Sequence, residues 1–407
     1  MDTPVPEARG GGAIRLLWLI DSLTAGGAEA LTVPFARALH REDRGEAAGV
    51  RLEIAFLKSL GGNPFEAELR DLEVPVTGLG ARNLRDVAAF RRLVRLLRQR
   101  RVGLVHAHLA YASIWGLLAG RLTGTPVVLT LHVRPPDDPP WSREGLRRRL
   151  LVGAANRWAR RALAVSGAVR DAWAAVGLRR ERIAVVHNGV ETAGMESGTE
   201  AAAAVRRELG VPGGAPLVVT VSVLRPGKGL EVLLEAVPAV LGEHPDARFA
   251  VVGDGPERRR LEEGAAAAGL GEAVVFTGFR RDVPALLAAA DLFVLPTRDD
   301  AFPTVLLEAQ AAGVAVVASR AGGVPEIVED GATGVLVPPG DPAALARAVS
   351  ALLADPAARR RLAEAGRRRT EERFSADAWL ARLDAVYSQV LGRPVRLGRR
   401  GAGEGAA

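Results

Sequence analysis

The residues around position 304 could together hold an anion. A short apolar run at 292–295 predicts a buried parallel strand, and a loop follows it. Pro303 suits the first turn of a helix that we expect to run from Thr304 to Ala312. Because the first amides of a helix have no acceptor within it, the N–H groups of Thr304 and Val305 form a ready anion site.

Two carboxylates accompany this helix start. Glu308 lies four residues after Thr304, so both share one helix face, with Glu308 one turn further in. Asp300 lies on the preceding loop, at the mouth of the same region. A carboxylate beside a bound anion could accept hydrogen bonds from hydroxyl groups, and a nucleotide offers both phosphate and vicinal hydroxyls. A helix cap followed by a solvated Glu is the alternative interpretation.

A second loop, at residues 224–229, carries two cations in a Gly- and Pro-rich setting. It follows an expected strand at 217–223 and precedes a helix. Arg225 and Lys228 on such a loop suit a diphosphate. The loop is not a P-loop, because it lacks both the GKS or GKT ending and the spacing of that motif.

The N-terminal half has a weaker glycine signal. Gly26 and Gly27 lie between an expected strand at 14–20 and a helix, where adjacent glycines allow a ligand to approach the backbone closely. The pattern is less specific than GxGxxG, and a tight turn without a ligand would also explain it.

Three histidines follow or end expected strands in the same half. His106, His108 and His132 lie at or just past strand carboxyl ends, where ligands bind in open parallel sheets. A single His in such a place is more often structural, but three of them favour a shared cleft. No acid or Cys completes a zinc ligand set with them.

To position these residues, strands must alternate with helices in both halves of the chain. This alternation predicts an α/β protein with two Rossmann-like, doubly wound parallel sheets facing a central cleft. We expect an N-terminal domain at 1–189, completed by a C-terminal helix at 375–392, and a second domain at 190–374. The segment 191–204 shows few signals of order, and the tail at 393–407 is expected to be disordered.

The composition is that of a globular protein without thiol chemistry. The 407 residues include no Cys, which excludes disulfides and thiolate metal ligands. The first residues are polar, and no window reaches the roughly 18 apolar residues of a membrane span. We therefore expect a cytoplasmic protein.

The net charge of +7 leaves more than one partner open. Basic stretches at 91–101 and 143–161 could contact an anionic membrane at its inner face, although a solvated charged surface explains them as well. Aromatic residues make up only 4% of the chain and do not alternate with basic ones, so no nucleic-acid partner is expected.

Several motifs in a fixed order resemble the retaining GT-B glycosyltransferases of family 4. The run from Asp300 to Glu308 resembles the family's E-x7-E element, and the loop at 224–229 resembles its phosphate loop. Other matches are Gly253-Asp-Gly-Pro256, Gly278-Phe279, Gly322-Gly-Val-Pro-Glu326, Gly26-Gly-Ala-Glu29, His132 and Asn188-Gly-Val190. The resemblance covers about Leu16 to Leu391.

The resemblance implies a donor site in the C-terminal half. Lys228 would balance the charge of the donor's diphosphate, and the amides of Thr304 and Val305 would hold its distal phosphate. Glu308 would bind the ribose hydroxyls. Phe279 and Arg280 would border the base.

The resemblance also implies roles nearer the acceptor. Gly26 and Gly27 would let the backbone close over the diphosphate and the acceptor. His132 would touch the sugar or the incoming acceptor. Asp300 would orient the donor sugar, with Lys228 and Arg225 completing the catalytic group.

Two positions depart from the family pattern. The first carboxylate of the E-x7-E element is Asp300, which is one methylene shorter than Glu. The Arg that usually precedes the Lys by five positions is replaced by Val223, and Arg225 on the same loop could supply the missing cation.

The implied activity is that of a retaining, metal-independent hexosyl- or glycosyltransferase with no cofactor. It would move a sugar from a nucleotide-diphospho-sugar to a saccharide or lipid-linked acceptor, in the synthesis of cell-surface polysaccharide, glycolipid or a related glycoconjugate. Uridine, guanosine and adenosine donors all stay open. Two alternatives remain: a sugar-nucleotide epimerase or hydrolase on the same fold, and a non-catalytic nucleotide-sugar-binding scaffold.

Overall fold

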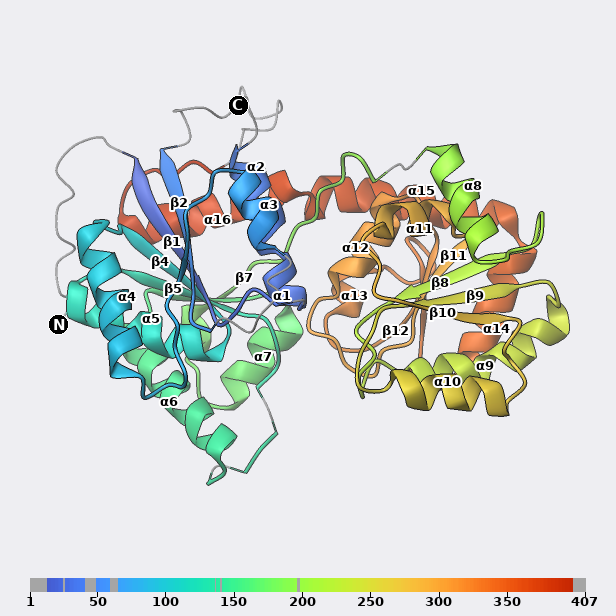
Figure 1. The fold of residues 1–407 in the computed structure, drawn as a ribbon, viewed down its shortest axis with the longest axis horizontal. Helices are drawn as coiled ribbons and strands as arrows, with labels where there is room; N and C mark the ends of the chain where they lie inside the picture. Colours follow the sequence, from blue (N-terminus) through green and yellow to red (C-terminus); the bar gives the residue numbers. More distant parts are fainter. Residues whose placement is uncertain are drawn as a thin grey trace. The chain divides into compact units, whose positions relative to one another are not determined.

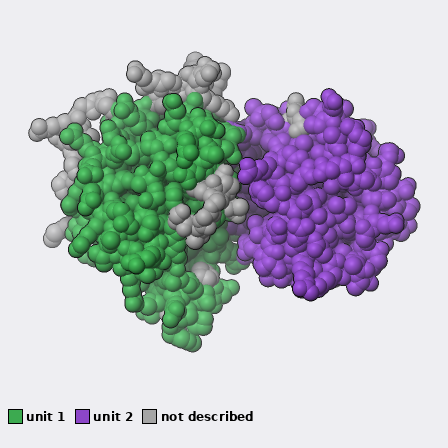
Figure 2. Space-filling view, viewed as in Figure 1, with its two compact units in different colours: residues 1–188, 376–407 green, residues 189–375 purple. Residues whose placement is uncertain are grey.

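The chain divides into two units, with boundaries after Asn188 and after Ser375. The computed structural model describes residues 13–24, 26–40, 49–58, 65–135, 137–139, 141–195 and 198–397. Unit 1 contains residues 1–188 and 376–407, and unit 2 contains residues 189–375 (Figure 2). The chain thus leaves unit 1 once and returns to it for its last helix.

Within the described residues, unit 1 is built on a seven-stranded parallel sheet in the order β3-β2-β1-β4-β5-β6-β7. The strands are β1 (Ile14–Ile20), β2 (Val50–Phe56), β3 (Val76–Gly78), β4 (Leu104–His108), β5 (Val127–Leu131), β6 (Arg161–Ala164) and β7 (Ile183–Val185). Strands β4 and β5 are buried throughout, as continuous apolar runs in a covered parallel sheet should be. The order reverses direction between β1 and β4, which is where such sheets bind ligands.

Helices cover both faces of this sheet (Figure 1). They are α1 (Gly27–Ala30), α2 (Thr32–His40), α3 (Glu66–Asp71), α4 (Val87–Gln99), α5 (Ala110–Thr123), α6 (Arg143–Trp158), α7 (Gly167–Ala175) and α16 (Ala376–Leu391), with a short 3₁₀ turn at Arg180–Arg182. The last helix has the bounds expected from its apolar spacing. Its Trp379 packs on Phe35 of α2, with ring centres 5.5 Å apart, so the end of the chain completes the core of unit 1.

The described part of unit 2 repeats the same plan with a six-stranded parallel sheet in the order β10-β9-β8-β11-β12-β13. The strands are β8 (Leu217–Val221), β9 (Arg248–Val252), β10 (Val274–Gly278), β11 (Leu292–Leu295), β12 (Val316–Ser319) and β13 (Val335–Val337). The helices are α8 (Thr199–Glu208), α9 (Leu230–Glu243), α10 (Arg258–Ala267), α11 (Val283–Ala289), α12 (Thr304–Ala311), α13 (Val324–Ile327), α14 (Pro342–Ala354) and α15 (Pro356–Phe374). The expectation of two doubly wound sheets is confirmed.

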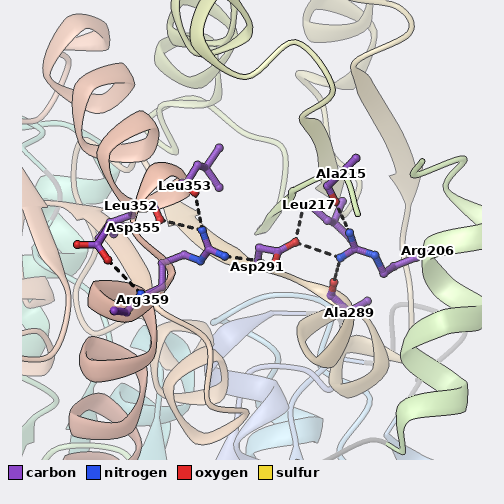
Figure 3. Close-up of polar contacts among 10 residues, drawn as sticks. Arg206, Ala215, Leu217, Ala289, Asp291, Leu352, Leu353, Asp355 and Arg359 are labelled. Carbon is purple, nitrogen blue, oxygen red and sulfur yellow. Dashed lines mark hydrogen bonds and ion pairs between the residues drawn. The ribbon is translucent and has the colours of Figure 1, made fainter. Parts of the chain in front are cut away.

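One part of the expected low-order segment at 191–204 is helical. Helix α8 begins at Thr199 and is held by long-range polar contacts that no local pattern reveals. Arg206 of α8 donates to the backbone oxygen of Ala289 at 2.7 Å and pairs with Asp291 at 3.1 Å (Figure 3). The expectation of little order is therefore wrong for residues 199–204.

Asp291 ties several elements together at the amino end of β11. Its carboxylate also accepts from the backbone N–H of Leu217 at 2.9 Å and lies 3.8 Å from Arg359 of α15 (Figure 3). Arg359 donates in turn to the backbone oxygens of Leu352 and Leu353 at the end of α14. This cluster fixes the edge of the sheet opposite the loops that bear the candidate site residues.

The expectation of a disordered tail from residue 393 is wrong for residues 393–397. Val395 and Leu397 are buried in the core of unit 1. The backbone N–H of Val395 donates to Ser388 Oγ at 2.8 Å, and that of Leu397 donates to Asp384. Residues 398–407 lie outside the described residues.

The helices in the described part of the chain are all too short or too polar to cross a membrane.

Candidate functional site

The loops at the carboxyl edge of the unit 2 sheet pack directly on one another. A Cβ atom at Gly229 would lie 1.9 Å from the backbone oxygen of Pro296, and one at Gly322 would lie 1.9 Å from that of Asp300. Both glycines also have positive φ, +69° and +52°, where other residues are strained. The loops after β8, β11 and β12 therefore meet only because these positions carry no side chain.

Lys228 and Asp300 meet where these loops join. Lys228 Nζ donates to Asp300 Oδ2 at 2.5 Å, and both side chains are only 15% exposed. The loop that carries Lys228 is further held by Thr297, whose hydroxyl lies 3.2 Å from the backbone oxygen of Gly227. A cation and a carboxylate predicted from separate motifs, 72 positions apart, thus form one ion pair.

Helix α12 starts at Thr304, as its sequence predicts, with Pro303 as the N-cap residue. Glu308 lies one turn into the helix and is partly buried. Burial raises the pKa of its carboxyl group, and a side-chain hydrogen bond from Thr304 opposes that shift. The first-turn amides of Thr304 and Val305 point out of the helix start, so an anion and a carboxylate could be placed side by side here.

Phe279 and Arg280 follow β10 and have different surroundings. The Phe279 ring is 58% exposed. Arg280 is held by two carboxylates, donating to Asp282 at 2.7 Å and to Glu208 of α8 at 3.0 Å. These partners raise the pKa of Arg280. Its guanidinium therefore fastens α8 to the end of β10, and the ring of Phe279 is the group open to a ligand.

Arg225 and Val223 are both exposed on the loop after β8. Among the described residues, no carboxylate pairs with Arg225. The loop thus offers an accessible guanidinium close in sequence to Lys228.

In unit 1, Gly26 and Gly27 stand at the start of the short helix α1. Gly26 is its N-cap residue, and a Cβ atom there would lie 2.3 Å from Oε2 of Glu29. Nothing lies within 4 Å of a Cβ atom at Gly27. Because the Glu29 oxygen ends a flexible side chain that can move away, packing requires glycine at neither position.

The three histidines of unit 1 fall into two groups. His106 is buried between Tyr387 of α16 and Thr130, with its ring nitrogens 2.6 Å and 2.7 Å from their hydroxyl oxygens. His108 Nδ1 lies 2.8 Å from His132 Nε2. His106 is thus a structural link to the last helix, while His108 and His132 form a separate pair.

Burial lowers the pKa of all three rings, to about 3 for His106, to about 4 for His132 and well below its ordinary value for His108. Each ring is therefore neutral at pH 7 and carries one N–H. His108 also stacks on Trp18, with ring centres 3.7 Å apart.

The hydrogen bond between His108 and His132 has a direction. Within the part of the chain that the structure describes, His108 Nε2 is buried and has no hydrogen-bond partner. Buried N–H groups are left unpaired more rarely than acceptors, so we assign the proton of His108 to Nδ1, which donates to His132. His132 then carries its own proton on Nδ1 and presents a donor to its surroundings.

Asp21 is a residue that the motifs do not single out. It follows β1, and its carboxylate accepts the backbone N–H groups of Ala112 at 2.6 Å and Tyr111 at 3.3 Å, in the first turn of α5. Burial raises its pKa to about 6. A polar residue directly after a buried strand is the one sequence signal that could have marked it.

Comparison with known proteins adds to this geometry. The model of the family described as glycosyl transferases group 1 matches residues 202–369, and that of glycosyltransferase family 4 matches residues 25–193. The chain is 33% identical to the 2-deoxystreptamine N-acetyl-D-glucosaminyltransferase of Streptomyces fradiae, over 95% of this chain and 92% of that protein. It is 32% identical to the 2-deoxystreptamine glucosyltransferase of Streptomyces kanamyceticus, over 80% of this chain and 88% of that protein.

A solved structure shows the same fold. The crystal structure of Anabaena HepE in complex with UDP-glucose superposes with a TM-score of 0.81 at 26% identity, covering 92% of this chain and 100% of that one.

Proposed function

The chain belongs to the glycosyl transferases group 1 and is a glycosyltransferase of the GT-B fold that uses a nucleotide sugar, and from that premise we propose that it is a retaining enzyme which needs no metal. Unit 2 would bind the nucleotide-diphospho-sugar, and unit 1 would bind the acceptor. The product would belong to a cell-surface polysaccharide, a glycolipid or a related glycoconjugate.

The observation that carries this proposal is the meeting of Lys228 with the loop before α12. During transfer, the bond between the anomeric carbon and the diphosphate breaks, and negative charge grows on the leaving phosphate. Lys228, Arg225 and the amides of Thr304 and Val305 are the groups that would stabilise that charge, so no metal is needed for it. Glu308 would accept hydrogen bonds from the ribose.

Retention requires that the acceptor oxygen attacks from the face that the diphosphate leaves. The departing phosphate oxygen would take the acceptor's proton as the new C–O bond forms. Asp300, which pairs with Lys228, would orient the sugar and leave Lys228 to the diphosphate. His132 would donate its Nδ1 hydrogen to an oxygen of the sugar or the acceptor, since a neutral ring with this tautomer is not a base at that atom.

A ligand panel tests the proposal. We expect a uridine, guanosine or adenosine diphosphate, or the matching nucleotide sugar, to raise the melting temperature of the full chain. At a ligand concentration of a hundred times its Kd, the free energy of unfolding should rise by about 2.7 kcal/mol. Turnover should require both a donor and an acceptor. Conversion of the donor alone would instead indicate an epimerase or hydrolase, and donor binding without turnover over many acceptors would indicate a scaffold.

We further propose that unit 1 contacts an anionic membrane from the cytoplasmic side. The first half of α6 exposes Leu146 (54%) and Leu150 (56%), and Trp141 just before it is 85% exposed. The exposed residues Arg143 and Arg149 flank them. Apolar side chains bordered by arginines are what an interfacial helix presents to anionic lipid.

Vesicle flotation tests this contact. The protein should float with vesicles that contain anionic lipid at low salt, and much less at about 0.5 M salt, where the Debye length falls to about 4 Å. Replacing Leu146 and Leu150 by Ser should weaken flotation, because it removes the apolar part of the contact. Leu122→Ser on α5, which is 59% exposed, is the matched control and should float normally. Equal loss in that control would argue against a specific patch.

A further inference from the structure

The connection between β4 and α5 is a single strained residue. Strand β4 ends at His108 and helix α5 begins at Ala110, so Leu109 alone turns the chain. Leu109 has φ 67° and ψ 173°, a combination that is essentially confined to glycine. Such strain persists only where the surroundings hold it, and it is concentrated at functional sites. Leu109 lines one pocket of unit 1 together with His132, so the strain lies beside a candidate site residue.

The start of α5 is capped by a residue from another part of the chain. A helix is usually capped by the side chain of its N-cap residue, which here is Leu109 and has no polar atom to offer. Asp21 replaces that cap. Its Oδ1 accepts the N–H of Ala112 at 2.6 Å, and its Oδ2 accepts that of Tyr111 at 3.3 Å. Each carboxylate oxygen therefore holds one amide of the first helical turn.

The sheet explains how Asp21 reaches this turn. Leu19 of β1 pairs with Ala107 of β4 in parallel register. Two residues further along, the same register, continued, sets Asp21 beside Leu109. The backbone oxygen of Asp21 also accepts the N–H of Lys58, just after β2, at 2.9 Å. The carboxylate thus extends from a backbone that is itself fixed, and it can hold the turn against the strain.

The residue on the sheet side of the turn is His108, which forms the pair with His132. His108 is in register with Thr130 at the end of β4, and its Nδ1 lies 2.8 Å from His132 Nε2. A movement of the turn would therefore move the His108 ring relative to His132. Because Nε2 of His132 accepts a hydrogen from His108, the hydrogen of the His132 ring itself stays on Nδ1. The tautomer of His132 depends on this contact.

We propose that Asp21 is a positioning residue for the histidine pair: its cap on α5 holds the strained turn at Leu109 and so keeps His108 bonded to His132. The inference rests on the proposed function, in which His132 donates to the sugar or the acceptor. Asp21 acts through the turn and not on the substrates. Without the cap, Leu109 would relax to negative φ, the end of β4 would shift, and the His132 ring could take its other tautomer.

Asp21→Asn tests this role, because an amide oxygen can accept only one of the two N–H groups. We expect kcat to fall by about tenfold or more, since a displacement of about 1 Å at a reacting group can cost about 100-fold. Asp86→Asn is the matched control, because Asp86 caps α4 in the same unit by accepting the N–H of Ala89 at 3.1 Å. The control should lose melting temperature but keep the parent kcat. An equal fall of kcat in both variants would overturn the proposal.

The strain at Leu109 provides a rescue that a merely structural cap would not show. Gly adopts the conformation of Leu109 without strain, whereas Ala removes most of the side chain and keeps the strain. The loss of kcat caused by Asp21→Asn should stay at about tenfold in a Leu109→Ala background and shrink to about threefold or less in Leu109→Gly. Each loss is measured within its own background, so direct effects of removing the Leu109 side chain cancel. Equal losses in the two backgrounds would overturn the role of the turn.

A readout without turnover separates this inference from the proposed function. Nitrogen NMR of the full chain with isotope-labelled histidine reports the tautomer of each of its six imidazole rings. The His132 signal is identified by its absence in His132→Gln. In the parent and in Asp86→Asn, His132 should carry its hydrogen on Nδ1, and Asp21→Asn should lose that preference.

The NMR outcomes and the activity outcomes have different consequences. Unchanged His132 signals in Asp21→Asn would overturn the positioning role, whatever the activity of the chain. The expected change of tautomer in a chain that transfers no sugar from any nucleotide donor would support the positioning role and contradict the proposed function.

Discussion

Replacing Lys228 by Ala is expected to lower kcat by about 100- to 1,000-fold, measured with saturating nucleotide sugar and acceptor. The size follows from the loss of one preorganised charge at the atom where negative charge develops. Lys228 is suited to this task because it is only 15% exposed and is already held in place by Asp300. Lys228→Arg should recover part of the rate, since it keeps the charge but not the geometry.

A structural loss must be separated from a catalytic one in this variant. Removing Lys228 leaves the Asp300 carboxylate partly buried without its partner, which should also lower stability. The double variant Lys228→Ala, Asp300→Asn should regain melting temperature and stay inactive. Arg298→Ala breaks a more exposed ion pair with Glu231 near the same loops and should change kcat less than about threefold. A Lys228→Ala enzyme within tenfold of the parent rate would contradict the assignment.

The fold could be predicted from the sequence because its signals are local. Helix α16 shows this best: its apolar residues recur at helical spacing, and Trp379, Leu383 and Tyr387 are indeed buried. The start of α12 at Thr304 follows from Pro303 in the same way. Periodicity and helix-start chemistry act over a few residues, so a single sequence displays them.

What could not be predicted depends on contacts between distant residues. The lack of order expected around residue 200 fails because Arg206 and Glu208 of α8 bind partners more than 70 positions away. The pairing of Arg280 with Glu208, 72 positions away, is a further contact of this kind, and the expected place of Arg280 beside the base stays a prediction. The roles of all the candidate site residues toward a donor or an acceptor stay predictions.

The pocket that His132 and several residues of α6 line illustrates the same limit. Arg147 and Arg148 look like two more residues of a basic helix in sequence. Only the fold shows that their face of α6 lies toward His132, while Leu146 and Leu150 face outward.

Glu308→Gln is expected to raise the KM for the nucleotide sugar by at least about tenfold. A hydrogen bond from a ribose hydroxyl to a carboxylate contributes about 1.5–3 kcal/mol, against about 0.5–1.5 kcal/mol for one to a neutral amide, and two such bonds would be weakened. The change is nearly isosteric, so the fold should be kept. The same substitution at Glu231 of α9, whose carboxylate pairs with Arg298, is the matched control. Unchanged donor kinetics in Glu308→Gln would rule out the ribose assignment.

The pH dependence gives a second, independent test of Glu308. Burial raises its pKa above the ordinary value of 4.5, so the carboxylate becomes protonated at a higher pH than a solvated Glu does. The donor KM should therefore also begin to rise at that higher pH. The parent enzyme should show this rise on acidification, and Glu308→Gln should not. Thr304→Val removes the hydrogen bond that lowers this pKa, so the rise should move to still higher pH.

Stability without donor should change in the opposite direction. A carboxyl group whose pKa is raised by folding contributes stability at low pH, and that contribution is lost as the pH rises through the folded pKa. Acidification would therefore weaken donor use while the Glu308 contribution to folding improves. Unfolding cannot produce that combination. If the donor KM rises on acidification while the melting temperature stays constant, the effect belongs to the carboxylate itself. A KM that follows the melting temperature, in parent and Glu308→Gln alike, would remove Glu308 from the donor site.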